Sequence, residues 1–140
     1  MMFLPKMQHS MGVGRKMAQI ATKKGLSKEQ IEDCFLLGLL HDIGYEYAEN
    51  LSEHEHIGGK VLERNGYRYW REVYYHGHPT DEYQSLYLDI LNAADQQVGT
   101  HGNDVGYENR LKDIKIRYGE NSKAYKDSCV LQERLKTLGL

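Results

Sequence analysis

Residues 6–24 place their apolar side chains at the spacing of an α-helix. One face of this predicted helix carries a histidine and three apolar residues: His9, Val13, Met17 and Ile20. The histidine therefore points in the same direction as the apolar stripe. Gly25 follows, and glycine is the residue that most often closes a helix at its C-terminal end.

The next segment predicts a helix that ends in an imidazole and a carboxylate. Ser27 and Gln30 have the spacing of a capping box, which places the start of the helix at Ser27. Beyond Cys34 the segment is apolar on every side, which is typical of a central buried helix. Gly38 lies inside it, and the close approach of a neighbouring helix would explain a glycine at this position. The apolar run closes with two polar residues and a glycine: His41, Asp42 and Gly44.

The rest of the chain predicts further helices and little of the alternation that is typical of strands. Ser52 and Glu55 have capping-box spacing, and Thr80 precedes two acidic residues, as at the start of a helix. Asp95 shares one face of that later helix with apolar residues. The predicted helices cover 52–65, 67–76, 80–98, 107–118 and 122–138, with a loop over 45–51. We therefore expect an all-α bundle of about six to seven helices.

Composition narrows the class of protein without indicating a function. A chain of 140 residues is expected to form one domain, with its motif-bearing part over about 8–98. A formal net charge of −2 gives no reason to expect a nucleic-acid or membrane surface. The two cysteines do not make a disulfide framework, and no apolar stretch is long enough to span a bilayer. The start of the chain is too short for a secretory signal, so we expect a cytoplasmic protein.

Four polar side chains lie on apolar helical faces or at the end of an apolar run: His9, His41, Asp42 and Asp95. They come from three different predicted helices. A carboxylate on a core-facing stripe is costly to bury unless it has a partner. A divalent metal bound by two imidazoles and two carboxylates would satisfy all four groups at once. The sequence therefore predicts a metal site where these helices meet.

The order of these residues resembles the HD-domain phosphohydrolase superfamily, and in particular its His-Asp-Ile-Gly branch. His54 takes the place of the histidine in the family's His-Pro-Glu-Ile-Gly-Ala block, and His76 that of the Ile-x-x-His that follows. The resemblance extends over about 8–98. The matching positions are His9, His41-Asp42-Ile43-Gly44, His54, His76 and Asp95.

The resemblance implies a helical hydrolase of phosphate esters or anhydrides, with nucleotides as the leading substrate class. Four residues would hold a first metal: His9, His41, Asp42 and Asp95. His54 and His76 would hold a second metal bridged by Asp42, and His41 and Asp42 would be the catalytic pair. The bacterial symmetric diadenosine-tetraphosphate hydrolases use this order of six residues. One or two ions of Mn, Fe, Co, Ni or Zn suit such a ligand set better than Mg does.

The chain departs from family patterns at two points. Lysine often follows His-Asp-Ile-Gly, and Tyr45 stands there instead, which removes one phosphate-facing cation. The Gly-Tyr-Pro signature of cyclic-di-GMP phosphodiesterases is absent. We therefore do not expect cyclic-di-GMP to be the substrate.

Three residues are candidates for substrate contact: Arg15, Lys60 and His78. Surface solvation is the simpler interpretation of the two cations, and a turn position is the simpler one of His78. His56 and His101 are expected to be exposed. The helices over 107–118 and 122–138 carry no assignable chemistry, and completing the core or a homodimer contact would account for them.

Two alternatives to a nucleotide hydrolase stay open. The same fold could hold a metal and a nucleotide as a sensor with little turnover, or it could hydrolyse a phosphomonoester that is not a nucleotide. The intact ligand set favours an enzyme, because a scaffold has no need of two metal sites.

Overall fold

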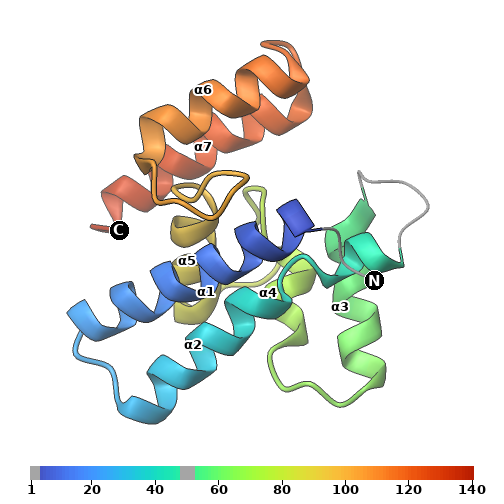
Figure 1. Ribbon diagram of the computed structural model, residues 1–140, viewed down its shortest axis with the longest axis vertical. Helices are drawn as coiled ribbons and strands as arrows, with labels where there is room; N and C mark the ends of the chain where they lie inside the picture. Colours follow the sequence, from blue (N-terminus) through green and yellow to red (C-terminus); the bar gives the residue numbers. More distant parts are fainter. Residues whose placement is uncertain (1–3, 48–52) are drawn as a thin grey trace.

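The computed structural model describes residues 4–47 and 53–140, and this part of the chain folds into seven α-helices and one short 3₁₀ helix. In chain order these are α1 (Leu4–Lys23), α2 (Lys28–Leu40), the 3₁₀ helix η1 (Ile43–Glu46), α3 (His54–Arg64), α4 (Trp70–Tyr75), α5 (Leu86–Asp95), α6 (Gly106–Tyr118) and α7 (Lys123–Thr137) (Figure 1). The expected all-α class is confirmed. Over the same residues, no helix is both long enough and apolar enough to cross a bilayer.

The start of α2 forms as the sequence predicts. The side chain of Ser27 accepts a hydrogen bond from the Gln30 backbone, and the Gln30 side chain accepts one from the Ser27 backbone. This is the expected capping box. Ser52, predicted to belong to a second capping box, lies outside the described residues, as does most of the predicted loop over 45–51.

α1 and α2 run antiparallel and cross at two glycines (Figure 1). A Cβ atom on Gly38 would collide with the backbone of Gly14, and one on Gly14 would lie 2.8 Å from the Phe35 carbonyl oxygen. The close approach that was inferred for Gly38 is therefore present. The core below this crossing includes Val13, Met17, Leu37, Ile90 and Leu91.

The prediction that α2 is buried on every side is wrong. Phe35 and Leu36 keep 37% and 47% of their surface exposed. α2 packs against α1 and α5, so its inner flank holds the core residues Cys34 and Leu37, while the opposite flank faces solvent.

The helix predicted over 80–98 begins later than expected, at Leu86. The hydroxyl groups of Tyr83 and Ser85 both donate to the buried Glu72 carboxylate, at 2.8 and 2.6 Å. These bonds tie the preceding segment to α4 in an extended path. Ser85 then caps α5 by accepting a hydrogen bond from the Leu88 backbone.

α6 and α7 form a hairpin that packs against α5, at one end of the molecule (Figure 1). Ala93 of α5 and Leu131 and Leu135 of α7 make a second buried cluster. The Gln132 side chain donates a hydrogen bond to the Gln96 side chain at 3.1 Å. The hairpin is thus held against the helix that ends in Asp95.

Candidate metal centre

Six side chains from five helices, or from the residues that directly follow them, lie close together in the bundle. Each is brought there by its position on or next to a helix: His9 within α1, His41 and Asp42 directly after α2, His54 at the start of α3, His76 directly after α4, and Asp95 at the end of α5. His9, His41, Asp42 and His76 are buried, and the other two are partly exposed. The structure therefore gathers all of the residues that the sequence suggested as metal ligands.

Asp95 and one oxygen of Asp42 face the first pair of histidines. The Nε2 atom of His9 lies 2.8 Å from Asp95 Oδ1 and 3.7 Å from Asp42 Oδ2. The Nε2 atom of His41 lies 3.5 Å and 3.3 Å from the same two oxygens. The Nε2 atoms of His9 and His41 therefore both face carboxylate oxygens of Asp42 and Asp95.

The other oxygen of Asp42 faces a second pair of histidines. His54 Nε2 lies 3.2 Å from Asp42 Oδ1, and His76 Nε2 lies 3.6 Å from it. The two oxygens of Asp42 therefore face different histidine pairs, and Asp42 is the residue that would be shared if each pair held an ion.

The opposite ring nitrogens fix how the histidines are turned. Nδ1 lies 2.9 Å from the Gly99 carbonyl oxygen in His9, 2.6 Å from the Gly38 carbonyl oxygen in His41, and 2.6 Å from the Val73 carbonyl oxygen in His76. A carbonyl can only accept, so each Nδ1 carries the hydrogen and each Nε2 is directed at the carboxylates.

His54 is oriented by a carboxylate instead, since its Nδ1 lies 3.2 Å from Glu55 Oε2. Such partners on the far ring nitrogen are the usual means of orienting metal-binding histidines.

The electrostatics of the cluster favour a cation. Burial alone would lower the pKa of His41, but the charges of Asp42 and Asp95 outweigh it and raise that pKa to about 10. Burial would likewise raise the pKa of the two carboxyl groups, yet the facing imidazoles hold both well below their usual range.

The donor set also fits a transition metal. Among the described residues, His41 Nε2 is buried and makes no well-formed hydrogen bond, although oxygens of Asp42 and Asp95 lie 3.3 and 3.5 Å from it. The sets His9, His41, Asp95 and His41, Asp42, His76 each offer ligand atoms within 4.8 Å of one another. Mixed imidazole and carboxylate donors suit Mn, Fe, Co, Ni or Zn.

A comparison with protein families agrees with this geometry. A family model for the HD domain matches residues 7–97. The chain belongs to the HD-domain family. Proteins of this family are generally metal-dependent hydrolases, and the matched segment includes all six clustered residues. No curated protein and no solved structure matches the chain.

A cavity of about 390 Å³ opens over the metal centre of this HD domain, within the size range of small-molecule sites. Its opposite wall comes from α6 and α7, beyond the matched segment, and includes Arg110, Arg117, Tyr118 and Lys123. No chemistry could be assigned to these helices from the sequence, because charged residues on an amphipathic helix have the same spacing whether they face solvent or a cavity.

The three predicted substrate contacts fall in different places. His78 lines the cavity of the HD domain, and burial lowers its pKa. Arg15 is exposed and Lys60 lies 3.3 Å from Glu63, and neither is among the residues that line the cavity. His56 and His101 are exposed, as expected.

Tyr45 occupies a defined place beside the second histidine pair of the HD domain. Its ring stacks on His54, with the ring centres 4.1 Å apart. The Nζ atom of Lys6 lies 3.7 Å from the centre of the Tyr45 ring, on its π face. A cation is therefore present near this position, although it comes from α1 and not from the residue after Gly44. Lys6 was missed because it lies before the matched motifs.

Proposed function

We propose that this HD domain is a metal-dependent phosphohydrolase that cleaves an ester or anhydride bond of a small phosphorylated molecule, with nucleotides as the leading class. The observation that carries the proposal is the direction of four Nε2 atoms onto the carboxylates of Asp42 and Asp95. When bound, a divalent metal supplies Lewis acidity and makes water a nucleophile at neutral pH.

The chain's own groups would hold and orient the reactants. Carbonyl groups of Gly38, Val73 and Gly99 fix three imidazoles, so that little reorganisation is needed when the site is loaded. Arg110 lies 3.8 Å from Asp95 and lines the cavity, where its charge would offset negative charge that develops on a phosphoryl group.

Symmetric hydrolysis of diadenosine tetraphosphate is the narrowest form of this proposal. It is supported by the order of the six clustered residues along the chain and by the position of Asp42 between two histidine pairs. The same substrate class could be bound without turnover, which would make the protein a sensor.

The test combines metal content with a substrate screen. Purified protein, loaded with Mn²⁺ or Fe²⁺, is assayed against p-nitrophenyl phosphate, nucleoside mono-, di- and triphosphates, and diadenosine tetraphosphate. Hydrolysis of at least one of them is expected, and it should be absent in Asp42→Asn but present in Asp89→Asn, the same change at a carboxylate that does not line the cavity. Tight metal binding without hydrolysis of any of these compounds would favour the sensor.

A further inference from the structure

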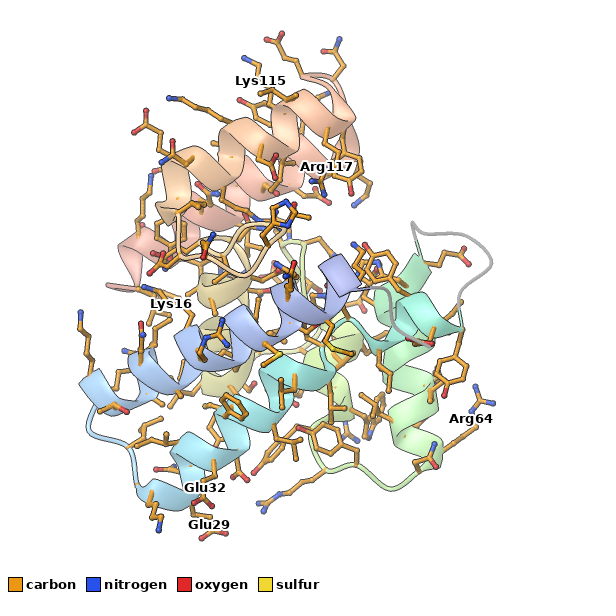
Figure 2. The ribbon with its side chains drawn as sticks, viewed as in Figure 1. Lys16, Glu29, Glu32, Arg64, Lys115 and Arg117 are labelled. Carbon is orange, nitrogen blue, oxygen red and sulfur yellow. The ribbon has the colours of Figure 1, made fainter. Side chains whose placement is uncertain are left out.

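Three cations converge on the cavity from outside the segment that matches the HD domain. Lys6 lies on α1 just before that segment, and Arg110 and Arg117 lie on α6 well after it. All three line the cavity above the metal centre. Figure 2 shows Arg117 on the side of α6 that faces the rest of the molecule, whereas Lys115 lies on the side away from it.

The three cations lie within electrostatic reach of one another. Burial is the main reason why the pKa of Lys6 is lowered, and the charges of Arg117 and Arg110 add to the effect. Asp42 and Asp95 oppose it, which places Lys6 near the metal centre as well. Like charges in a partly buried cavity repel one another strongly, and an anion bound between them offsets this repulsion.

Few acidic side chains pair with these cations. Asp113 forms ion pairs with two of them, at 3.5 Å from Arg110 and 3.7 Å from Arg117. Lys6 contacts the Tyr45 ring and, among the described residues, has no carboxylate within ion-pair distance. Lys123, also in the cavity wall, is already neutralised by Asp127.

The other acidic side chains that line the cavity are Asp42 and Asp95 of the metal centre and Glu55, which lies 3.2 Å from His54. If Asp42 and Asp95 bind metal ions, their negative charges are neutralised by the metal and no longer offset the positive charges of Lys6 and Arg110. The positive charge of the wall then favours an anion supplied by a ligand. Phosphate is a suitable one, since guanidinium and ammonium groups bind its oxygens through charge-assisted hydrogen bonds.

We propose that Lys6, Arg110 and Arg117 form a phosphate subsite beside the metal centre, and that the substrate carries at least two linked phosphate groups. This inference rests on the proposed function and narrows it from esters or anhydrides to phosphoanhydrides. One phosphate lies at the metal centre, and the next lies on the three cations.

The reaction at such a pair of subsites is hydrolysis of the P–O–P link. The oxygen of water forms a bond to the phosphorus at the metal centre, and the bond from that phosphorus to the bridging oxygen breaks. The electron pair stays on the bridging oxygen, which leaves with the phosphate held by the cations. The two protons of water end on the two phosphate products or pass to solvent.

Binding of inorganic pyrophosphate and inorganic phosphate tests the subsite. Calorimetry is performed on Mn²⁺-loaded native protein and on a Lys6→Gln, Arg117→Gln double variant. Arg110 is left in place because it also contacts Asp95. Pyrophosphate should bind the native protein about tenfold or more tightly than phosphate, and the double variant should lose that preference while its phosphate affinity stays within about twofold.

A matched control separates the subsite from a general effect of charge. Lys23→Gln and Lys115→Gln remove exposed cations from the same two helices and should leave pyrophosphate affinity unchanged. The subsite is overturned if native protein binds the two anions equally, or if the double variant weakens both alike.

The same experiment distinguishes failure of the subsite from failure of the proposed function. If native protein hydrolyses a substrate but the double variant binds pyrophosphate as tightly as native protein does, the proposed function stands and the subsite is wrong. If nothing is hydrolysed while pyrophosphate binding depends on both residues, the subsite stands and the protein is a sensor of linked phosphates.

Discussion

At the scale of single residues, the site depends on what each histidine does with its second ring nitrogen. His41 and His76 each follow the last residue of a helix, and each donates Nδ1–H to a carbonyl three residues earlier. Each of these carbonyls also accepts a long hydrogen bond from the backbone N–H of the same histidine, at 3.4 and 3.5 Å, so a histidine in the capping position reaches it with both groups. The ligand residues could be predicted from their order in the chain. The acceptor of His9, Gly99, could not, because it lies 90 residues away.

Removing the shared carboxylate tests the centre most directly. Asp42→Asn keeps the shape of the side chain but removes its charge, so metal affinity should fall by about a hundredfold or more. Metal content after dialysis, measured by mass spectrometry, checks this. Asp89→Asn serves as the control, because Asp89 does not line the cavity over the metal centre. A variant at Asp42 that keeps its metal through dialysis would contradict the assignment.

Metal uptake should also depend on pH. In the metal-free protein His41 keeps a proton up to about pH 10, and a metal ligand must be neutral. Each unit of pH between 7 and 9 should therefore raise metal affinity by about tenfold, as chelator competition can measure. Affinity that stays constant over this range would show that no proton is displaced.

The same proton affects folding of the metal-free protein. The pKa of His41 in the folded protein lies above its unfolded value of about 6.5. The protonated imidazole therefore adds to the free energy of unfolding, and this contribution is fully present below pH 6.5. The contribution is lost as the pH rises through about 10. Urea unfolding of chelator-treated protein should therefore show a lower free energy of unfolding at pH 9.5 than at pH 7.

At the scale of helices, the sequence predicted the elements whose bounds follow from local sequence signals. α1, α2, α6 and α7 begin and end within about two residues of the expected positions, and the starts of α2 and α7 are capped locally by Ser27 and Ser122. α5 was different. Thr80 has the sequence features of a helix start, but the bonds of Tyr83 and Ser85 to the distant Glu72 carboxylate decide the path. No local pattern contains that information.

The crossing of α1 and α2 links packing to the site, because α1 carries His9 and α2 leads into His41. Gly38→Ala would push a methyl group against the backbone of Gly14. We expect a loss of about 2 kcal/mol in the free energy of unfolding, despite the better helix propensity of alanine. Urea unfolding measures this change, and metal content should fall as well.

The control for this change lies on the opposite flank of α2. Leu36→Ala alters a side chain that is 47% exposed, so it should change stability by less than about 0.5 kcal/mol. Equal losses for the two variants would show that the glycine crossing has no special role.

At the scale of the whole molecule, residues 7–97 hold the metal-binding cluster, and α6 and α7 close the cavity over it. The sequence predicted both helices of the hairpin but not their position, because Arg110 and Arg117 have the spacing of ordinary surface charges. The approach of Arg110 to Asp95 and the position of Arg117 in the cavity wall depend on buried contacts of α7 with α5, which are long-range.

Metal binding should stabilise the entire fold, since its ligands come from α1, α3 and α5 and from the residues that follow α2 and α4. At metal concentrations about 100 times the dissociation constant, removal with a chelator should lower the melting temperature by about 10 °C. Calorimetry or circular dichroism checks this. The melting temperature of Asp42→Asn should change little with chelator. An equal decrease in both proteins would show that the stabilising metal binds at a site that does not include Asp42.

The convergence of α2, α4 and α5 has a further consequence for the site. His41 and His76 directly follow α2 and α4, and Asp95 ends α5, so three helices point their C-terminal ends at one place. Each helix dipole contributes partial negative charge at that end, about half an elementary charge in a long helix. The peptide backbone therefore attracts a cation in addition to the side chains. This part of the attraction persists in any side-chain variant, because it belongs to the arrangement of the helices.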